Sequence, residues 1–341
     1  MKRERLFYLD FVRAIAAISI VMTHFNARYL YLNPPMPEKA VITTTVSNIY
    51  IGGWGVSLFF IISGAALMYV YEEKCEIKQF YKKRFFSIYP MFWIAYIFAF
   101  FYFFYKNKSV PGGGAPKINF IFSILGFDGL LAENIPTFYI LGEWFLGAII
   151  LMYLLFPVLR KLVNERPVIT IVGILLIYFY IVFFYRLSFN PAKLIFTRLP
   201  EIVFGMYFVK WRKKVNWKVA LIALIVLILN GVLKPGWSDI MQTTYVGIAS
   251  FLVLVYLSYF MENRWCQWGA SIISKYSYAI FLVHHVIIGC MMATFDLTTI
   301  TRLHSYLLFM TISVVIAFMA FLLYHFHSYL MRQLSLVMRG E

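Results

Sequence analysis

Long apolar stretches separated by short polar segments run along almost the whole chain. Ten of these stretches approach the length and hydrophobicity of membrane-spanning helices, which need about 20 predominantly apolar residues. They are residues 7–26, 49–71, 86–105, 138–159, 167–186, 196–210, 217–233, 243–261, 272–294 and 304–328. The pattern predicts an all-α, polytopic integral membrane protein with about ten transmembrane helices, built as one membrane domain over residues 1–341.

Two apolar segments depart from this pattern. The stretch 196–210 is the weakest of the predicted spans, because it is short and contains charged residues and a proline. Residues 119–131 are too short to cross a bilayer and are interrupted by two glycines. We expect this second segment to be re-entrant or to lie at the membrane interface.

Composition supports the membrane class. The 341 residues are 62% hydrophobic and only 13% charged, and the mean hydropathy is +0.76, values typical of helical membrane proteins rather than soluble ones. The first apolar run lacks a small-residue cleavage site, so we expect it to stay as a helix. The three cysteines are scattered without a CxxC pair, and the sequence therefore predicts neither a disulfide framework nor a metal site.

The distribution of Lys and Arg predicts the orientation. With ten spans, twenty of the 31 cations fall on the side that holds both termini, ten fall on the other side, and Arg13 lies within the first span. Because cytoplasmic loops are enriched in Lys and Arg, we place both termini in the cytoplasm and the protein in the cell inner membrane. The net charge of +16 resides in short loops beside apolar runs, which indicates contact with membrane lipids and not with nucleic acid.

Three ionisable residues lie in the otherwise apolar first span: Asp10, Arg13 and His24. Charged groups inside a membrane are expensive and are usually functional. Asp10 and Arg13 have the i,i+3 spacing that lets two helical side chains meet. His24 follows Arg13 by about three helical turns, so the three residues predict a polar stripe on one helix, on the order of 16 Å long.

A basic segment precedes the third span. Lys82, Lys83 and Arg84 are expected in a cytoplasmic loop, directly before a helix that begins at Tyr89. Such cations anchor proteins to anionic lipids. They also bind phosphate groups, so the alternative is an electropositive entrance for an anionic cytoplasmic substrate such as a nucleotide-bearing cofactor.

Further polar residues in later spans are candidates for a cavity that holds the acceptor. These are Glu143, Trp144, Arg198, Glu201 and His284. The alternatives are a structural Arg198–Glu201 ion pair at i,i+3 spacing and a histidine that is hydrogen-bonded between helices. His284 is followed by His285, and since neighbouring helical residues point about 100° apart, we expect at most one of them to face the same cavity as His24.

Five motifs occur in a fixed order along the chain. They are D-x-x-R-x10-H (Asp10 to His24), G-V-x-L-F-F-I-I-S-G (Gly55 to Gly64), K-R-F-x-x-I-Y-P (Lys83 to Pro90), W-F-L followed by Y-L-L-x-P (Trp144 to Pro157), and S-Y-x-I-F-L-V-H (Ser277 to His284). The first is fairly specific and the others are specific in combination. Over about residues 7–330, this order and spacing resemble the membrane acyltransferase-3 family.

The resemblance implies a ten-span fold with cytoplasmic termini. It also implies transfer of an acyl group, usually acetyl from cytoplasmic acetyl-CoA, to a hydroxyl of a carbohydrate or lipid-linked glycan acceptor. His24 and Arg13 would be the essential pair, and the basic segment would face the coenzyme A phosphates, with acetyl-CoA as co-substrate and no bound cofactor. The chain departs from the family at Ser87, where many members have a second Arg, and at Ile149, where some have Glu.

A mechanism follows as a hypothesis. His24 would be the general base or a transient acyl carrier, since a histidine pKa lies near the working pH. Asp10 would orient Arg13, which would contact the donor. The alternative function is a multispanning transporter or exporter with a polar midplane site, but the chain shows no internal repeat of the kind many transporters have.

Overall fold

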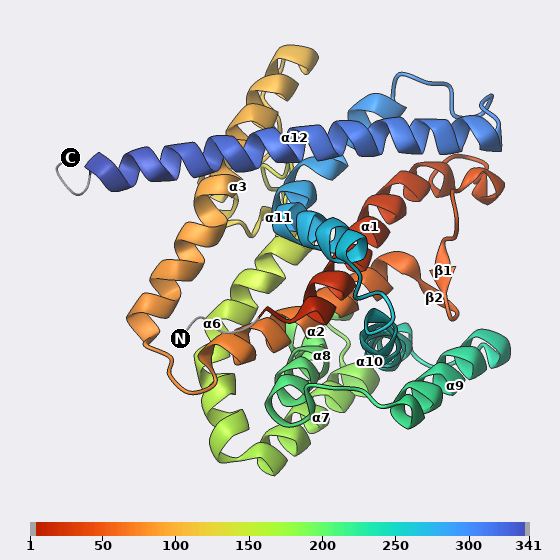
Figure 1. The fold of residues 1–341 in the computed structure, drawn as a ribbon. Helices are drawn as coiled ribbons and strands as arrows, with labels where there is room; N and C mark the ends of the chain where they lie inside the picture. The colour runs from red at the N-terminus through yellow and green to blue at the C-terminus, as the bar shows by residue number, and fades with distance from the viewer. Residues whose placement is uncertain (1–4, 338–341) are drawn as a thin grey trace. The chain divides into compact units, whose positions relative to one another are not determined.

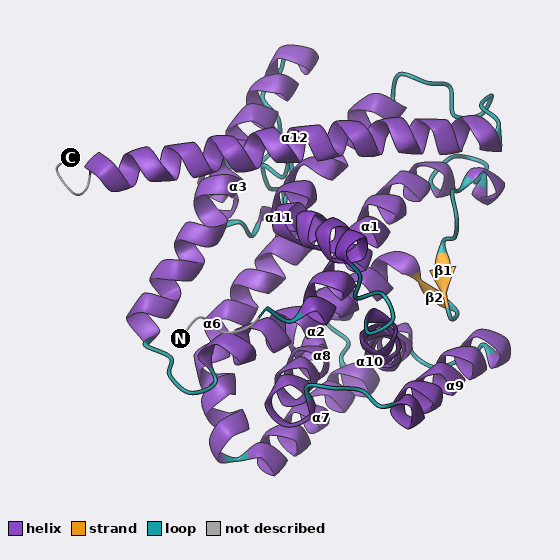
Figure 2. Cartoon of the chain, in the orientation of Figure 1, coloured by secondary structure: helices purple, strands orange, loops and turns teal. Residues whose placement is uncertain are grey.

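The computed structural model describes residues 5–337, and these residues are almost entirely helical (Figures 1 and 2). The α-helices are α1 (Phe7–Leu30), α2 (Ile51–Tyr71), α3 (Ile77–Asn107), α4 (Phe120–Leu125), α5 (Asp128–Leu131), α6 (Glu143–Glu165), α7 (Pro167–Phe184), α8 (Ile195–Tyr207), α9 (Trp217–Leu233), α10 (Asp239–Ser258), α11 (Arg264–Met292) and α12 (Arg302–Val337). The shorter elements are the 3-10 helices η1 (Pro37–Lys39), η2 (Lys117–Asn119) and η3 (Pro191–Lys193), the π-helical turn η4 (Phe208–Arg212), and the antiparallel strands β1 (Thr45–Val46) and β2 (Ile49–Tyr50).

Each predicted span corresponds to a helix. Among the described residues, eight helices are long and apolar enough to cross a membrane: α1, α2, α3, α6, α7, α10, α11 and α12. The other two predicted spans form α8, of 13 residues, and α9, of 17 residues. The all-α class and the several membrane helices are thus confirmed, whereas ten crossings and cytoplasmic termini stay predictions. Three of the cations used to predict the orientation, at positions 2, 3 and 339, lie outside the described residues.

The boundaries of two segments differ in an informative way. Helix α3 begins at Ile77, well before the predicted start, and Pro90 lies inside it. The segment 119–131 forms the short helices α4 and α5, and Gly126 ends α4 in the left-handed conformation at φ 74°. A glycine adopts this conformation without steric cost, which explains why the segment breaks there.

The exposed faces of several helices are apolar. In α7 only 17% of the most apolar window is buried inside the protein, and in α12 only 28%, although the mean hydropathy of both windows is 2.5. Water would not solvate such faces, whereas lipid chains would. The exposure pattern therefore supports a multi-pass membrane protein.

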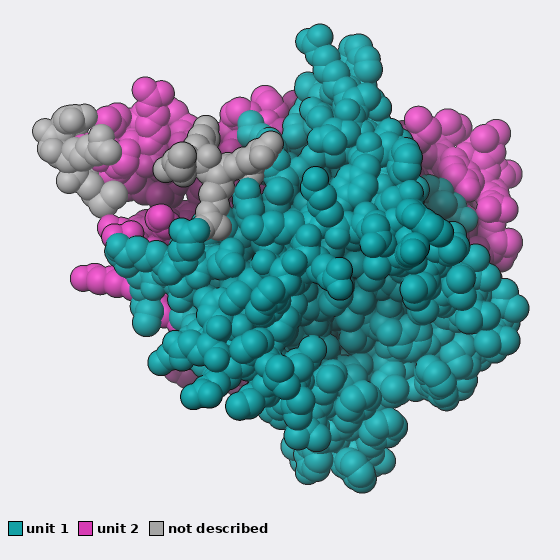
Figure 3. Space-filling view, turned by 60° about the horizontal axis from the view of Figure 1, so that its bottom comes forward, with its two compact units in different colours: residues 1–23, 42–77, 148–275 teal, residues 24–41, 78–147, 276–341 magenta. Residues whose placement is uncertain are grey.

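The chain divides into two compact units, which are coloured separately in Figure 3. Unit 1 comprises residues 1–23, 42–77 and 148–275, and unit 2 comprises residues 24–41, 78–147 and 276–341. Four of the boundaries fall inside helices, in α1, at the start of α3, in α6 and in α11. Each unit is described by itself below.

Close helix packing through glycines organises unit 1. A Cβ atom added at Gly64 on α2 would lie 2.0 Å from the Ile202 carbonyl oxygen of α8, and one added at Gly205 would lie 2.0 Å from the Ile61 carbonyl oxygen. No larger residue fits at either position. Membrane helices commonly approach one another through such small residues, so the glycines of the second motif have a packing role here.

In unit 2, hydrogen bonds fix the segment that leads into α6. The Tyr96 hydroxyl of α3 donates to the Phe138 carbonyl over 2.6 Å, and the Tyr278 hydroxyl of α11 donates to the Ile88 carbonyl over 3.0 Å. A Cβ at Gly129 would lie 2.6 Å from the backbone carbonyl of Glu143. The start of α6 is therefore held against α5 by backbone packing that only glycine permits.

Candidate active site

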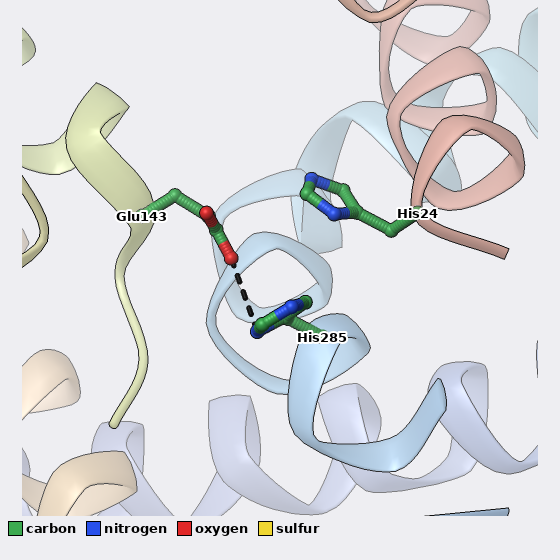
Figure 4. A group of neighbouring side chains, drawn as sticks. All are labelled: His24, Glu143 and His285. Atoms are coloured by element: carbon green, nitrogen blue, oxygen red, sulfur yellow. Dashed lines mark ion pairs between the residues drawn. The ribbon is translucent and has the colours of Figure 1, made fainter. Parts of the chain in front are cut away.

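Three histidines and one carboxylate from three helices meet in unit 2. The His24 ring of α1 lies 4.9 Å from the His284 ring and 5.2 Å from the His285 ring, both of α11. Glu143, at the start of α6, places Oε1 3.1 Å from His285 Nδ1 (Figure 4). We call His24, Glu143, His284 and His285 the histidine cluster.

The expectation that at most one of His284 and His285 would face His24 is wrong. Both rings contact the His24 ring at nearly equal centroid distances. The separation of about 100° applies to the Cα–Cβ bonds, but an imidazole extends far enough from the helix to bend back toward a shared neighbour. His24 therefore lies against two rings that diverge at the backbone.

The backbone sets the position of Glu143. This residue has φ 45°, in the left-handed region, and it follows Gly142 at φ 97°. Two consecutive residues of positive φ turn the chain sharply into α6, and for a glutamate this conformation is strained. Strain of this kind persists where surrounding packing enforces it, and here the contact with Gly129 does so.

His284 forms the enclosed wall of the cluster. Its side chain is buried, and Nδ1 lies 2.8 Å from the Phe281 carbonyl. A carbonyl oxygen only accepts hydrogen bonds, so Nδ1 carries the proton and Nε2 presents a lone pair. Among the described residues, the buried Nε2 atom has no hydrogen-bond partner. His285, with 43% of its side chain exposed, forms the accessible side.

A second polar group surrounds Asp10 in unit 1. Asp10 and Arg13 are 3.8 Å apart, which confirms the predicted i,i+3 pair. Asp10 also pairs with Arg5 and accepts a hydrogen bond from the Ser274 hydroxyl over 2.5 Å. Arg13 in turn donates to Ser274 over 3.1 Å. We call Asp10, Arg13, Arg5 and Ser274 the carboxylate–guanidinium group.

The histidine cluster and the carboxylate–guanidinium group were each predicted only in part from the sequence. Helix α1 is continuous from Phe7 to Leu30, as predicted for the helix that carries Asp10, Arg13 and His24. Ser274 and Arg5 were not predicted, because a serine and a terminal arginine carry no signal of long-range contacts. His285 was noted in the sequence beside His284, but at most one of the two was expected to face the same cavity as His24.

Arg198 and Glu201 do not line an open cavity, which corrects the prediction for these two residues. They belong to unit 1, where their side chains are 4% and 0% exposed and lie 3.4 Å apart. Arg198 also donates to the Ala192 carbonyl over 3.0 Å. Their i,i+3 spacing serves the buried ion pair that was the alternative interpretation.

The basic segment lies on a helix and not in a loop, a second correction. Lys82 and Lys83 are exposed on the early turns of α3, and Arg84 is half-buried with its guanidinium 5.9 Å from the centre of the Phe80 ring. The extended start of α3 accounts for the difference. Trp144 is half-buried beside Phe145 in unit 2, and its contact with an acceptor stays a prediction.

Comparison with known proteins identifies the relatives of the chain. The acyltransferase-3 family model, described as an acyltransferase domain, matches residues 6–324. The chain is 26% identical over 171 residues to the acyltransferase MdmB of Streptomyces mycarofaciens, an alignment that covers 48% of this chain and 41% of that protein. The matched region thus spans less than half of the length of this relative. No solved structure matches the chain.

Proposed function

The chain belongs to the acyltransferase-3 family, and we propose that it is a membrane-bound O-acyltransferase of the cell inner membrane. It takes an acetyl or other short acyl group from cytoplasmic acyl-CoA and transfers it to a hydroxyl of a carbohydrate acceptor, such as an exopolysaccharide, an O-antigen or another cell-surface glycan. The observation that carries this proposal is the histidine cluster around His24.

The chemistry needs a group that accepts a proton. The acceptor hydroxyl oxygen attacks the thioester carbonyl carbon, a new C–O bond forms, and the C–S bond breaks. An imidazole nitrogen of His24 takes the hydroxyl proton and returns it to the departing coenzyme A thiolate. Imidazole suits both steps because the same ring nitrogen can accept a proton and release it again. Within residues 5–337 no hydrogen bond engages His24, which leaves its ring nitrogens available for this work.

Glu143 and His285 both face His24 in the cluster, and the ligand atoms of these three side chains all lie within 4.8 Å of one another (Figure 4). The His285 ring, whose Nδ1 lies 3.1 Å from the Glu143 carboxylate, would donate an N–H hydrogen bond to the oxyanion that develops on the thioester carbonyl. Glu143 and His284 thus serve the reaction centre rather than a separate acceptor wall. Arg13, held by Asp10 and Ser274, keeps the proposed role of contacting the donor.

Donor binding is proposed for the basic segment. Lys82 and Lys83 are exposed on α3, and each presents an ammonium group that attracts the phosphates of coenzyme A. Arg84 adds a guanidinium that is anchored over Phe80. We propose a carbohydrate acceptor because sugar hydroxyls are the usual acceptors in the acyltransferase-3 family.

The test is turnover of acetyl-CoA by the purified protein in lipid. Release of free coenzyme A is followed with and without a crude cell-envelope glycan extract, for the wild type, His24→Ala and the control His304→Ala. His304 is an exposed histidine of α12 in unit 2, outside the cluster. We expect release that requires both the extract and His24 and that survives His304→Ala.

Two results would contradict the proposal. Normal release by His24→Ala would remove the histidine cluster from the reaction. An absence of both release and acetyl-CoA binding in the wild type would favour the multispanning transporter or exporter instead.

A further inference from the structure

Part of the histidine cluster has the composition of a metal site. His24, Glu143 and His285 each offer one ligand atom, and these three atoms all lie within 4.8 Å of one another (Figure 4). Two imidazoles and one carboxylate are a recognised ligand set of catalytic zinc, and also of non-haem iron. The three residues come from three separate helices, α1, α6 and α11, so their meeting does not follow from sequence proximity.

The Glu143 carboxylate gives an independent indication of a missing cation. Its Oε1 atom is buried and has no hydrogen-bond partner among the described residues. His285 Nδ1 lies 3.1 Å from Oε1 as an ion-pair contact, and the Tyr139 hydroxyl lies beside the same carboxylate. A buried carboxylate oxygen without a directed donor is costly, and a bound cation would compensate it.

His284 gives a second independent indication. Its Nδ1 is occupied by the Phe281 carbonyl, so the lone pair of Nε2 is fixed in a buried position beside the His24 ring. Among residues 5–337 this nitrogen has no partner. A buried acceptor without a partner is costly, and beside the three candidate ligands it would accept a hydrogen bond from a water bound to a cation there.

The spacing permits zinc after a modest contraction. Zinc bonds of about 2.0–2.1 Å at tetrahedral angles place ligand atoms about 3.3 Å apart. The widest pair here must therefore approach by up to about 1.5 Å. Glu143 and His285 retain 18% and 43% of their side-chain exposure, which leaves them room to rotate. Three protein ligands leave a fourth position open, as in catalytic zinc sites.

We propose that His24, Glu143 and His285 bind one divalent transition-metal ion, with zinc as the best match to the ligand set. This replaces the expectation, drawn from the cysteines, that the chain has no metal site. The proposal concerns binding and stands apart from acyl transfer. If both hold, His24, Glu143 and His285 would hold the ion, which as a Lewis acid would polarise the acceptor hydroxyl, and the hydroxyl proton would pass to the departing coenzyme A thiolate.

Metal content is the decisive measurement, because His24→Ala removes activity under either mechanism. The full chain is purified in lipid without a histidine tag, treated with chelator, incubated with Zn²⁺ and desalted. Metal per chain is then measured by mass spectrometry for the wild type, His24→Ala, Glu143→Gln, His285→Ala and the control His304→Ala. We expect about one zinc per chain in the wild type and the control, and at least a tenfold weaker affinity in each ligand variant.

A spectroscopic measurement keeps the proposal testable if a variant misfolds. Co²⁺ bound to the wild type in a tetrahedral site gives strong visible absorption, and Zn²⁺ should displace it. Wild-type protein that binds no more zinc than the three ligand variants, and that gives no Co²⁺ spectrum, would overturn the proposal.

The outcomes also separate the two proposals. In one outcome, chelator-treated protein takes up no zinc and still turns over acetyl-CoA at the full rate. This result would overturn the metal site and leave the acyltransferase proposal intact. Stoichiometric zinc that is lost in the ligand variants, without turnover of acetyl-CoA, would support the metal site and contradict the acyltransferase proposal.

Discussion

The two polar groups that α1 contributes to differ in how their charges are satisfied. In the carboxylate–guanidinium group, Asp10 has Arg5, Arg13 and Ser274 as partners, and Arg13 and Ser274 also contact each other. In the histidine cluster, Glu143 Oε1 and His284 Nε2 are buried without hydrogen-bond partners among the described residues. Near the start of α1 the charged side chains all have partners, whereas near its end two polar atoms of the histidine cluster have none among the described residues.

This difference separates stabilising residues from reactive ones. A charge that is fully compensated lowers the free energy of the folded state relative to a version with one partner missing. Lone pairs left without partners cost stability, and native proteins retain few of them outside functional sites. We therefore expect loss of Asp10 to affect mainly folding and loss of His24 to affect mainly chemistry, whereas Arg13 keeps its proposed contact with the donor.

The sharpest test of the comparison is His24→Ala. Loss of the proton-accepting ring should lower turnover by about 10²–10⁴-fold, the usual contribution of general acid–base catalysis. The melting temperature should change little, because the His24 ring makes no hydrogen bond within the described part of the chain. Turnover and thermal unfolding in lipid check this, and a melting temperature that falls as far as that of Asp10→Ala would contradict it.

Asp10→Ala should have the opposite profile. Removing the carboxylate leaves Arg13 without its counter-ion inside the helix bundle, which should cost about 3 kcal/mol of folding free energy. This is the low end for a broken buried pair, because 27% of the Arg13 side chain is exposed. Thermal unfolding measures the loss. Asp10→Asn is the matched control, since its amide oxygen can still accept from Ser274, and it should lose less.

A buried aspartate outside the spans, Asp128, extends the comparison to pH. Burial raises the pKa of Asp128 to about 6, and no cation pairs with it within residues 5–337. The folded state therefore binds more protons than the unfolded state between about pH 4 and pH 6. Its contribution to stability is fully present below about pH 4 and is lost as the pH rises through about 6.

Asp128→Asn should remove this pH dependence. The amide oxygen can still accept from the Gly129 N–H, which Asp128 Oδ1 does over 2.9 Å. At pH 8 the variant should be more stable than the wild type by on the order of 2–3 kcal/mol, and near pH 4 the two should match. Melting temperatures across this range are the measurement, and parallel curves would show that Asp128 does not titrate near pH 6.

Gly129→Ala tests the positioning of Glu143. The new Cβ would meet the Glu143 backbone at 2.6 Å, so the start of α6 must shift. A displacement on the order of 1 Å at a reaction centre can cost about 10²-fold in rate, and we expect at least a tenfold loss of turnover. Gly114→Ala is the control, since nothing lies within 4 Å of its added Cβ. Equal activity of the two variants would show that the position of Glu143 does not affect the reaction.

The smallest effect is expected at the exposed basic segment. Lys82→Ala combined with Lys83→Ala should raise the KM for acetyl-CoA a few-fold and leave kcat unchanged, because exposed charges contribute only about 0.2–1 kcal/mol each. The increase should shrink at high salt, where such charges are screened. A change in kcat alone would contradict a role in donor binding.

Prediction from the sequence succeeded where the signal is local. Apolar length identified a helix for every expected span, and the i,i+3 spacing identified the Asp10–Arg13 pair, which forms at 3.8 Å. It failed where several partners compete for one residue. For the same spacing at Arg198 and Glu201 the sequence left a cavity and a structural ion pair as alternatives, and helix packing decided for the ion pair by burying both side chains.

The sequence by itself determined the class of this protein, because bilayer thickness and backbone hydrogen bonding leave an apolar chain few options other than spanning helices. It also determined that α1 carries Asp10, Arg13 and His24, since helical geometry is local. Only the tertiary structure decided that Glu143 and His285 meet His24 and that Ser274 bridges Asp10 and Arg13. These contacts join residues far apart in the chain, and helix packing, which no local pattern encodes, sets them.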